Sequence, residues 1–132
     1  MADVNRGNRP LSPHIEIYRP QWTSVSSILV RITGIASLGT ALIIVVWLLM
    51  AATSEGAFQA ANWWMQSWLG QLVLLAATWA ISYHTLGRLR HVIWDFGYCL
   101  EVAISEQMAK GLFALATILT LIVAIFFLGV AP

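Results

Sequence analysis

The feature that most restricts the fold of this chain is a set of long apolar segments with almost no charge. Residues 32–53 have no charged side chain over 22 positions, and residues 112–130 have none over 19. Residues 63–86 form a third uncharged segment, although it includes a histidine and two glutamines. About 20 mostly apolar residues cross the hydrocarbon core as a helix, and a helix pairs its own backbone groups, as lipid requires. The sequence therefore predicts an all-α membrane protein with three transmembrane helices, at about residues 24–53, 63–92 and 108–130.

The composition excludes several classes of protein. Only 10% of the 132 residues are charged, against about 25% in soluble domains. A net charge of +1 lacks the basic excess that nucleic-acid binding needs. The single cysteine, Cys99, permits neither a disulfide within the chain nor a metal site built from cysteines. We expect a polar arm at residues 1–23, with no cleaved signal peptide, and one three-helix transmembrane domain at residues 24–132.

The distribution of positive charge predicts an orientation. All lysines and arginines lie in the N-terminal segment up to Arg31 or between the second and third uncharged segments, at residues 87–111, whereas residues 52–62 contain Glu55 and no cation. Cytoplasmic loops of membrane proteins carry the excess of lysine and arginine. We therefore expect a multi-pass protein of a bacterial inner membrane, with a cytoplasmic N-terminus and a periplasmic C-terminus. The cations are Arg6, Arg9, Arg19, Arg31, Arg88, Arg90 and Lys110.

A polar stripe runs from the second predicted helix toward the cytoplasm. His84, Arg88, His91 and Asp95 fall within about 60° of one another on a helix. Ionisable groups within a membrane are costly and are candidates for function. A neutral imidazole at this depth suits an axial ligand of haem iron, or it forms a hydrogen bond with a neighbouring helix. Asp95 could take protons from water or pair in solvent with an arginine.

A second pair of polar residues lies at the start of the first predicted helix. Ser27 and Arg31 are four residues apart, so they share a helix face. Together a guanidinium and a hydroxyl can hold a carbonyl oxygen or a haem propionate. The alternative is that Arg31 extends along the helix to the membrane surface. Because the first two helices run in opposite directions, Arg31 and His84 are expected at the same depth, near the cytoplasmic boundary.

Two ordered blocks of sequence match a known family. The first starts with Arg-Pro-Leu-Ser-Pro-His at residues 9–14 and continues to Arg-Ile-Thr-Gly at residues 31–34. The second contains His84, then Arg-His at residues 90–91 and Asp-Phe-Gly at residues 95–97. In these blocks the chain resembles the cytochrome b membrane-anchor subunit, the larger of two anchors, of succinate dehydrogenase, which is respiratory complex II.

The resemblance implies a function and a set of site residues. It implies a subunit of a succinate:quinone oxidoreductase that links the citric acid cycle to the respiratory chain. The partners would be a smaller membrane anchor, an iron–sulfur subunit, a flavoprotein subunit and membrane lipid. The cofactor would be haem b, and the bound substrate ubiquinone or menaquinone. By resemblance, His84 is the haem-iron ligand, opposite a ligand from the smaller anchor. Ser27 and Arg31 bind quinone, Arg31 and His91 lie near the haem propionates, and Asp95 lies at the proton entry.

The sequence departs from the family pattern at two positions. Val30 stands where the family has a histidine before Arg31, so any contact made by that histidine must come from elsewhere. The glycine expected four residues after His84 is displaced to Gly87, and Arg88 takes its place. Two other functions remain open: a haem-free structural anchor of a related fumarate reductase, and a small transporter subunit. The transporter would need several ionisable groups at mid-membrane, whereas here they gather near one face.

Overall fold

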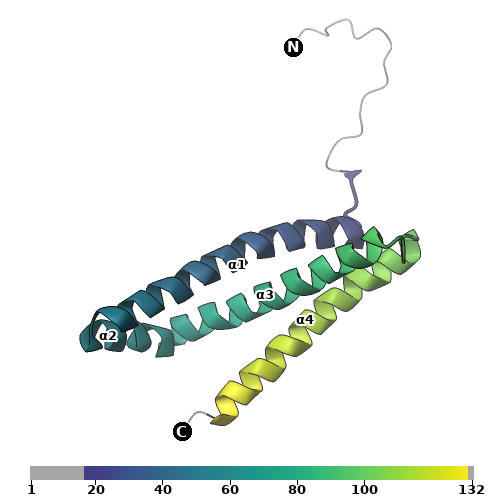
Figure 1. Cartoon of the computed structure of the whole chain (residues 1–132). Helices are drawn as coiled ribbons and strands as arrows, with labels where there is room; N and C mark the ends of the chain where they lie inside the picture. Colours follow the sequence, from purple (N-terminus) through teal and green to yellow (C-terminus); the bar gives the residue numbers. More distant parts are fainter. Residues whose placement is uncertain (1–16, 131–132) are drawn as a thin grey trace, which may run out of the picture.

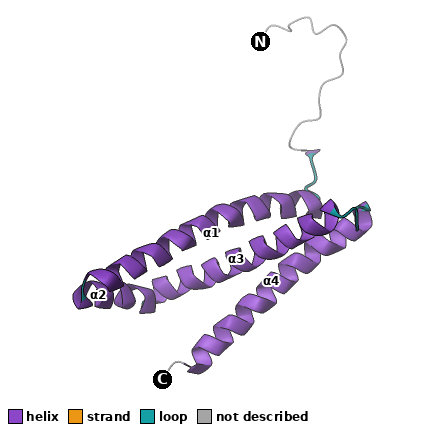
Figure 2. Cartoon of the chain, viewed as in Figure 1, coloured by secondary structure: helices purple, strands orange, loops and turns teal. Residues whose placement is uncertain are grey.

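The chain forms a bundle of four helices in the computed structural model, which describes residues 17–130. Helices and their connections make up all of this part, without a strand (Figure 2). Three of the helices are long and apolar enough to cross a membrane, which confirms the predicted all-α fold with three such helices. Most of the predicted arm at residues 1–23 lies outside the described residues. The helices are α1 (Trp22–Thr53), α2 (Glu55–Gln66), α3 (Trp68–Asp95) and α4 (Val102–Val130).

The second predicted helix starts later in the structure than the sequence suggested. The prediction starts it at residue 63, but α2 continues to Gln66 and α3 starts after it. The reason is a pair of serine caps. Ser54 accepts a hydrogen bond from the N–H of Ala57 at 3.2 Å, and Ser67 accepts one from the N–H of Gly70 at 3.1 Å. Both serines have extended backbones, as helix N-caps do, so each ends one helix and starts the next.

The three long helices pack most closely where α1 starts. Helices α1 and α3 lie side by side in opposite directions, while α4 diverges from them toward its C-terminal end (Figure 1). The buried cluster consists of Val30 on α1, Tyr83 on α3, and Leu112 and Ala116 on α4. Outside this cluster, large apolar side chains face outward; Ile35, for example, is 75% exposed. Outward-facing apolar residues suit a bundle whose surroundings are lipid.

Side-chain hydrogen bonds between polar groups join neighbouring helices inside the bundle. They link α1 to α3, α3 to α4 and α1 to α2, so each of these pairs has a directional contact as well as apolar packing. Such bonds are a common means of holding helices together in lipid. The three bonds are Tyr83 Oη to Ser26 Oγ at 3.0 Å, Trp79 Nε1 to Thr117 Oγ1 at 3.2 Å, and Trp47 Nε1 to Asn62 Oδ1 at 3.0 Å.

Candidate functional site

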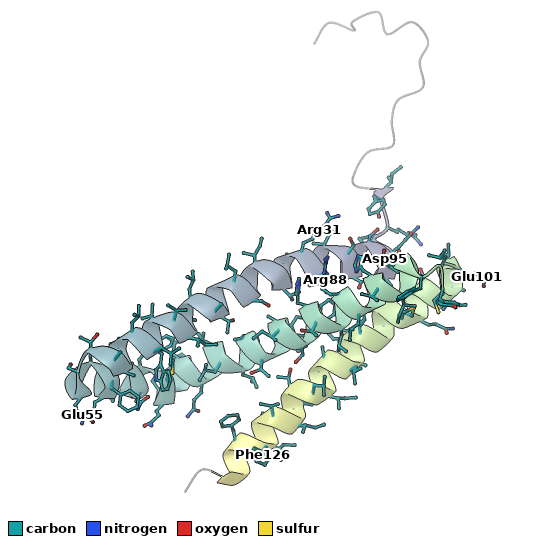
Figure 3. All side chains as sticks on the ribbon, viewed as in Figure 1. Arg31, Glu55, Arg88, Asp95, Glu101 and Phe126 are labelled. Carbon is teal, nitrogen blue, oxygen red and sulfur yellow. The ribbon has the colours of Figure 1, made fainter. Side chains whose placement is uncertain are left out.

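Most charged side chains that the sequence singled out lie toward one end of the bundle. We call it the α1-start end, because α1 and α4 begin there and α3 ends there (Figure 1). Figure 3 shows Arg31 and Arg88 in the half of the bundle near this end, and Asp95 and Glu101 at its tip. Glu55 lies at the opposite end. The charge asymmetry of the sequence is therefore also an asymmetry of the folded chain.

His84 is held against α1 by a hydrogen bond to a backbone carbonyl. Its Nδ1 lies 2.9 Å from the carbonyl oxygen of Val30, and the side chain is half-buried. A carbonyl oxygen can only accept, so Nδ1 carries the proton and donates it. The neutral ring then has its electron pair on Nε2, the atom that can bind a metal. An imidazole with one nitrogen tied to a carbonyl and the other free is the usual form of a histidine ligand.

The two departures from the family pattern meet in space. Gly87 faces α1, and a Cβ atom built there would collide with Cγ2 of Val30. Val30 is only 5% exposed, so its side chain fills the space that the glycine leaves. The valine therefore faces the α1–α3 interface, and its role is packing. Any contact that the family histidine makes must come from another residue, as the sequence suggested.

Ser27 and Arg31 share α1, but their surroundings differ. Ser27 is half-buried and lines a shallow groove at the start of α1, where the hydroxyls of Tyr18 and Ser24 lie 3.0 Å apart. Arg31 is exposed one turn further along and is not among the lining residues. Sequence reasoning missed Tyr18 and Ser24, since only the folded N-terminal turn brings them beside Ser27. The remaining groove residues are Pro20, Thr23, Val25 and Ile28.

The other two predicted site residues lie further along α3. His91 is half-buried; its Nδ1 lies 2.7 Å from the carbonyl oxygen of Gly87, and its ring meets the edge of Trp94 at 5.2 Å between centroids. It follows His84 by seven residues, about 10 Å along the helix axis. Asp95 is the last residue of α3 and is exposed. The structure therefore places His84, His91 and Asp95 in order along one helix toward the α1-start end.

These geometries limit how a metal could be held. Among residues 17–130, no group of three or more His, Cys, Asp or Glu side chains converges on one point. An iron bound at Nε2 of His84 would therefore need ligands besides the His, Cys, Asp and Glu side chains of the described part of the chain. A porphyrin supplies four nitrogens, and a second protein can supply the other axial ligand.

Comparison with known proteins decides the family. The sequence pattern of the succinate dehydrogenase/fumarate reductase transmembrane subunit family matches residues 5–125. The chain belongs to this family. Membership confirms the resemblance drawn from the two sequence blocks, and together with the three long helices it makes the chain a multi-pass membrane anchor of the succinate dehydrogenase/fumarate reductase class.

Relatives from different organisms match between 71% and 96% of the chain. The succinate dehydrogenase cytochrome b556 subunit of Paracoccus denitrificans is 45% identical over 127 residues, which are 96% of this chain and 98% of that protein. The cytochrome b560 subunit of Reclinomonas americana is 34% identical over 125 residues, 91% of this chain and 87% of that protein. The cytochrome b556 subunit of Rickettsia conorii is 36% identical over 94 residues, 71% and 73% of the two chains.

Arg90 is a buried cation for which sequence reasoning found no role beyond pairing in solvent. It is 2% exposed, and within residues 17–130 its Nε and Nη1 have no hydrogen-bond partner. Its guanidinium lies 4.5 Å from the ring centre of Trp94, a cation–π contact. Arg90 lies on the buried face of α3 with Tyr83 and Gly87, roughly 100° around the helix from the His84 stripe. The helical spacing that places Arg90 on the same face as Tyr83 and Gly87 was the signal by which the sequence could have revealed its burial.

Proposed function

We propose that this chain is the membrane-anchor subunit of a succinate:quinone oxidoreductase, in which it binds haem b with a second anchor subunit and forms part of the quinone site. The observation that carries the proposal is the state of His84, whose Nδ1 is bonded to the carbonyl of Val30 while Nε2 has no hydrogen-bond partner within residues 17–130. The names of the relatives, cytochrome b556 and b560 subunits of succinate dehydrogenase, support the haem and the enzyme.

The residues of this chain fit a haem b. His84 would bind the iron through Nε2, and Arg31 and His91 would lie toward the propionates. Arg31 is exposed, so its guanidinium can meet a carboxylate that another subunit or cofactor presents. Bound haem would supply a one-electron redox centre in the membrane.

The quinone would bind at the groove that Ser27 lines. Oxidation of succinate to fumarate on the flavoprotein releases two electrons and two protons, and the electrons travel through the iron–sulfur subunit. The quinone takes up two electrons and two protons to become the quinol. The Ser27 hydroxyl can donate to one quinone carbonyl oxygen, and Arg31, one turn away, adds positive charge where the reduced oxygen forms. Exposed Asp95 would let protons enter from water at this end.

The orientation and location follow from charge. The α1-start end would face the cytoplasm of a bacterium, because it carries the cations of the described helices and positive loops stay inside. The C-terminal end of α4 would then be periplasmic. The 45% identity to a bacterial protein supports placement in a bacterial inner membrane. The soluble flavoprotein and iron–sulfur subunits would dock at the cytoplasmic end.

A difference spectrum of the purified complex tests the haem assignment. We expect a b-type band in the reduced-minus-oxidised spectrum, its loss in His84→Ala, and its retention in His91→Ala. A complex that assembles without any b-type band would instead fit the haem-free anchor of a fumarate reductase. An unchanged band in an assembled His84→Ala complex would refute His84 as the ligand.

The quinone assignment has its own test. Ser27→Ala and Arg31→Ala are expected to lower succinate-to-quinone activity about 10-fold or more, the scale of a lost charge-assisted or transition-state contact. Succinate oxidation with a soluble dye should continue in both. Ser37→Ala is the matched control, because Ser37 lies on α1 but donates to the carbonyl of Thr33 at 2.8 Å. Normal quinone turnover in both site variants would contradict the assignment.

A further inference from the structure

Helix α1 touches His84 at two points. One is the hydrogen bond from Nδ1 to the carbonyl of Val30. The other is Gly34, one turn later: a Cβ atom built there would lie 2.8 Å from Cε1 of His84 and 3.1 Å from Nδ1. Real Cβ atoms do not approach other atoms at 2.8 Å. The imidazole therefore lies against bare backbone at Gly34, in a space that any other residue would close.

We propose that α1 determines the ring plane and the protonated nitrogen of His84, with Gly34 as the positioning residue and the carbonyl of Val30 as the hydrogen-bond acceptor. The inference rests on the proposed binding of haem iron by His84 and adds to it two contacts from another helix that orient this ligand. The carbonyl selects the tautomer, because only a protonated Nδ1 can donate to it. The absent side chain at position 34 lets the ring come close enough to reach that carbonyl.

The two contacts of α1 with His84 would affect the iron in two measurable ways. A hydrogen bond from the far nitrogen raises the basicity of a histidine ligand, and a more basic ligand stabilises ferric over ferrous iron, which lowers the reduction potential. The ring plane sets how the ligand orbitals overlap with those of the iron, which the g-values of the ferric EPR spectrum report. Moving the ring off Gly34 should therefore raise the midpoint potential and shift the largest g-value.

The spacing of the two helices at this point depends on a second contact. Gly87 is one turn after His84 on α3, and it receives the side chain of Val30. A methyl group at position 87 would press on Val30, the residue whose carbonyl holds Nδ1. The same hydrogen bond can thus be disturbed from the other helix without touching Gly34 or the imidazole.

The test compares Gly34→Ala with Gly39→Ala in the complete complex. Gly39 lies on the same helix, and a methyl group at this position would meet no atom of residues 17–130 within 4 Å, so it controls for the general effect of alanine on helix stability. We expect Gly34→Ala to raise the haem midpoint potential and shift the largest g-value, or to lose haem from an assembled complex. Gly39→Ala should match the unmodified complex in both measurements.

A rescue pair keeps the inference testable if Gly34→Ala fails to assemble. Gly87→Ala should shift the potential and g-value in the same directions, and Gly87→Ala combined with Val30→Ala should restore both, because the smaller residue makes room for the new methyl group while its carbonyl remains. Unchanged values in Gly34→Ala and Gly87→Ala, with His84→Ala losing haem, would overturn the inference and leave the proposed function intact. An unmodified complex without haem would overturn both.

Discussion

The buried hydrogen bond between Tyr83 and Ser26 allows a quantitative test of how α1 and α3 are held together. The Tyr83 hydroxyl donates to Ser26 Oγ at 3.0 Å, and the two residues are 1% and 2% exposed. Tyr83→Phe removes this bond alone, since the phenyl ring keeps its stacking on Trp79, 5.1 Å away. Ser26→Ala removes the acceptor instead. The double variant replaces the polar pair with apolar groups of nearly the same shape.

The three variants should differ in how much free energy of unfolding they lose. In Tyr83→Phe, the freed Ser26 hydroxyl can turn to a carbonyl of its own helix, as Thr33 and Thr40 on α1 do. The loss should then be about 0.6 kcal/mol, the mean for hydrogen bonds between membrane helices, and at most about 1.7 kcal/mol. In Ser26→Ala, the buried tyrosine hydroxyl lies too far from its own backbone to find a substitute, so the loss should be about 1–3 kcal/mol. The double variant should cost no more than Ser26→Ala alone.

The assay is unfolding of the purified chain in mixed micelles with increasing SDS, followed by far-UV circular dichroism. The free energies of unfolding of the two single variants and the double variant form a double-mutant cycle, and we expect a coupling energy of about 1 kcal/mol. Thr78→Val is the control, because the hydroxyl of half-buried Thr78 donates within its own helix, to the carbonyl of Leu74. Additive losses, or a larger loss in Tyr83→Phe than in Ser26→Ala, would refute the reasoning.

Two further predictions concern other buried positions. Arg90→Met in the isolated chain should leave the free energy of unfolding unchanged or raise it by up to about 4 kcal/mol. The reason is that it removes a buried cation whose Nε and Nη1 have no hydrogen-bond partner within residues 17–130. A clear loss of unfolding free energy in the same SDS titration would contradict this. Gly70→Ala should destabilise the chain by about 1–3 kcal/mol, because its methyl group would collide with Met65 Cα at 2.9 Å and with the backbone before it. In Gly56→Ala the new methyl group would meet no described atom within 4 Å, so this variant should be neutral or more stable by up to about 1 kcal/mol. Equal effects in the two glycine variants would argue against the close packing of α2 on α3.

Hydropathy was sufficient to predict the three long helices but not their ends. Helix α4 begins at Val102, six residues before the predicted start. Its first turns carry Glu106 and Lys110. A helix can extend into water with such charged residues, but a search for apolar segments does not detect this extension. The break at Ser67 was missed because apolar residues, tryptophans among them, lie on both sides of it. A single capping serine is a weak signal within a segment that looks continuous.

The candidate site was harder to predict because it depends on how helices are rotated against one another. Periodicity placed His84, His91 and Asp95 on one stripe of a helix, and the structure has them in that order along α3. It could not show which backbone carbonyl of α1 faces His84, because that depends on the register between two helices. Arg90 illustrates the same limit: its burial follows from the contacts of α3 with its neighbours, whereas the sequence suggested an arginine in solvent.

The continuity of α1 has a consequence for electron transfer. On the proposed assignments, one unbroken helix carries Ser27 at the quinone and Gly34 at the haem ligand, seven residues or about 10 Å apart along its axis. Because the iron ligand itself, His84, lies on α3, the spacing between the two redox groups would depend on α1 and on its contacts with His84. A tilt of α1 would move Ser27 and the two contacts that orient His84 together, so one motion would disturb the quinone site and the haem ligand at the same time.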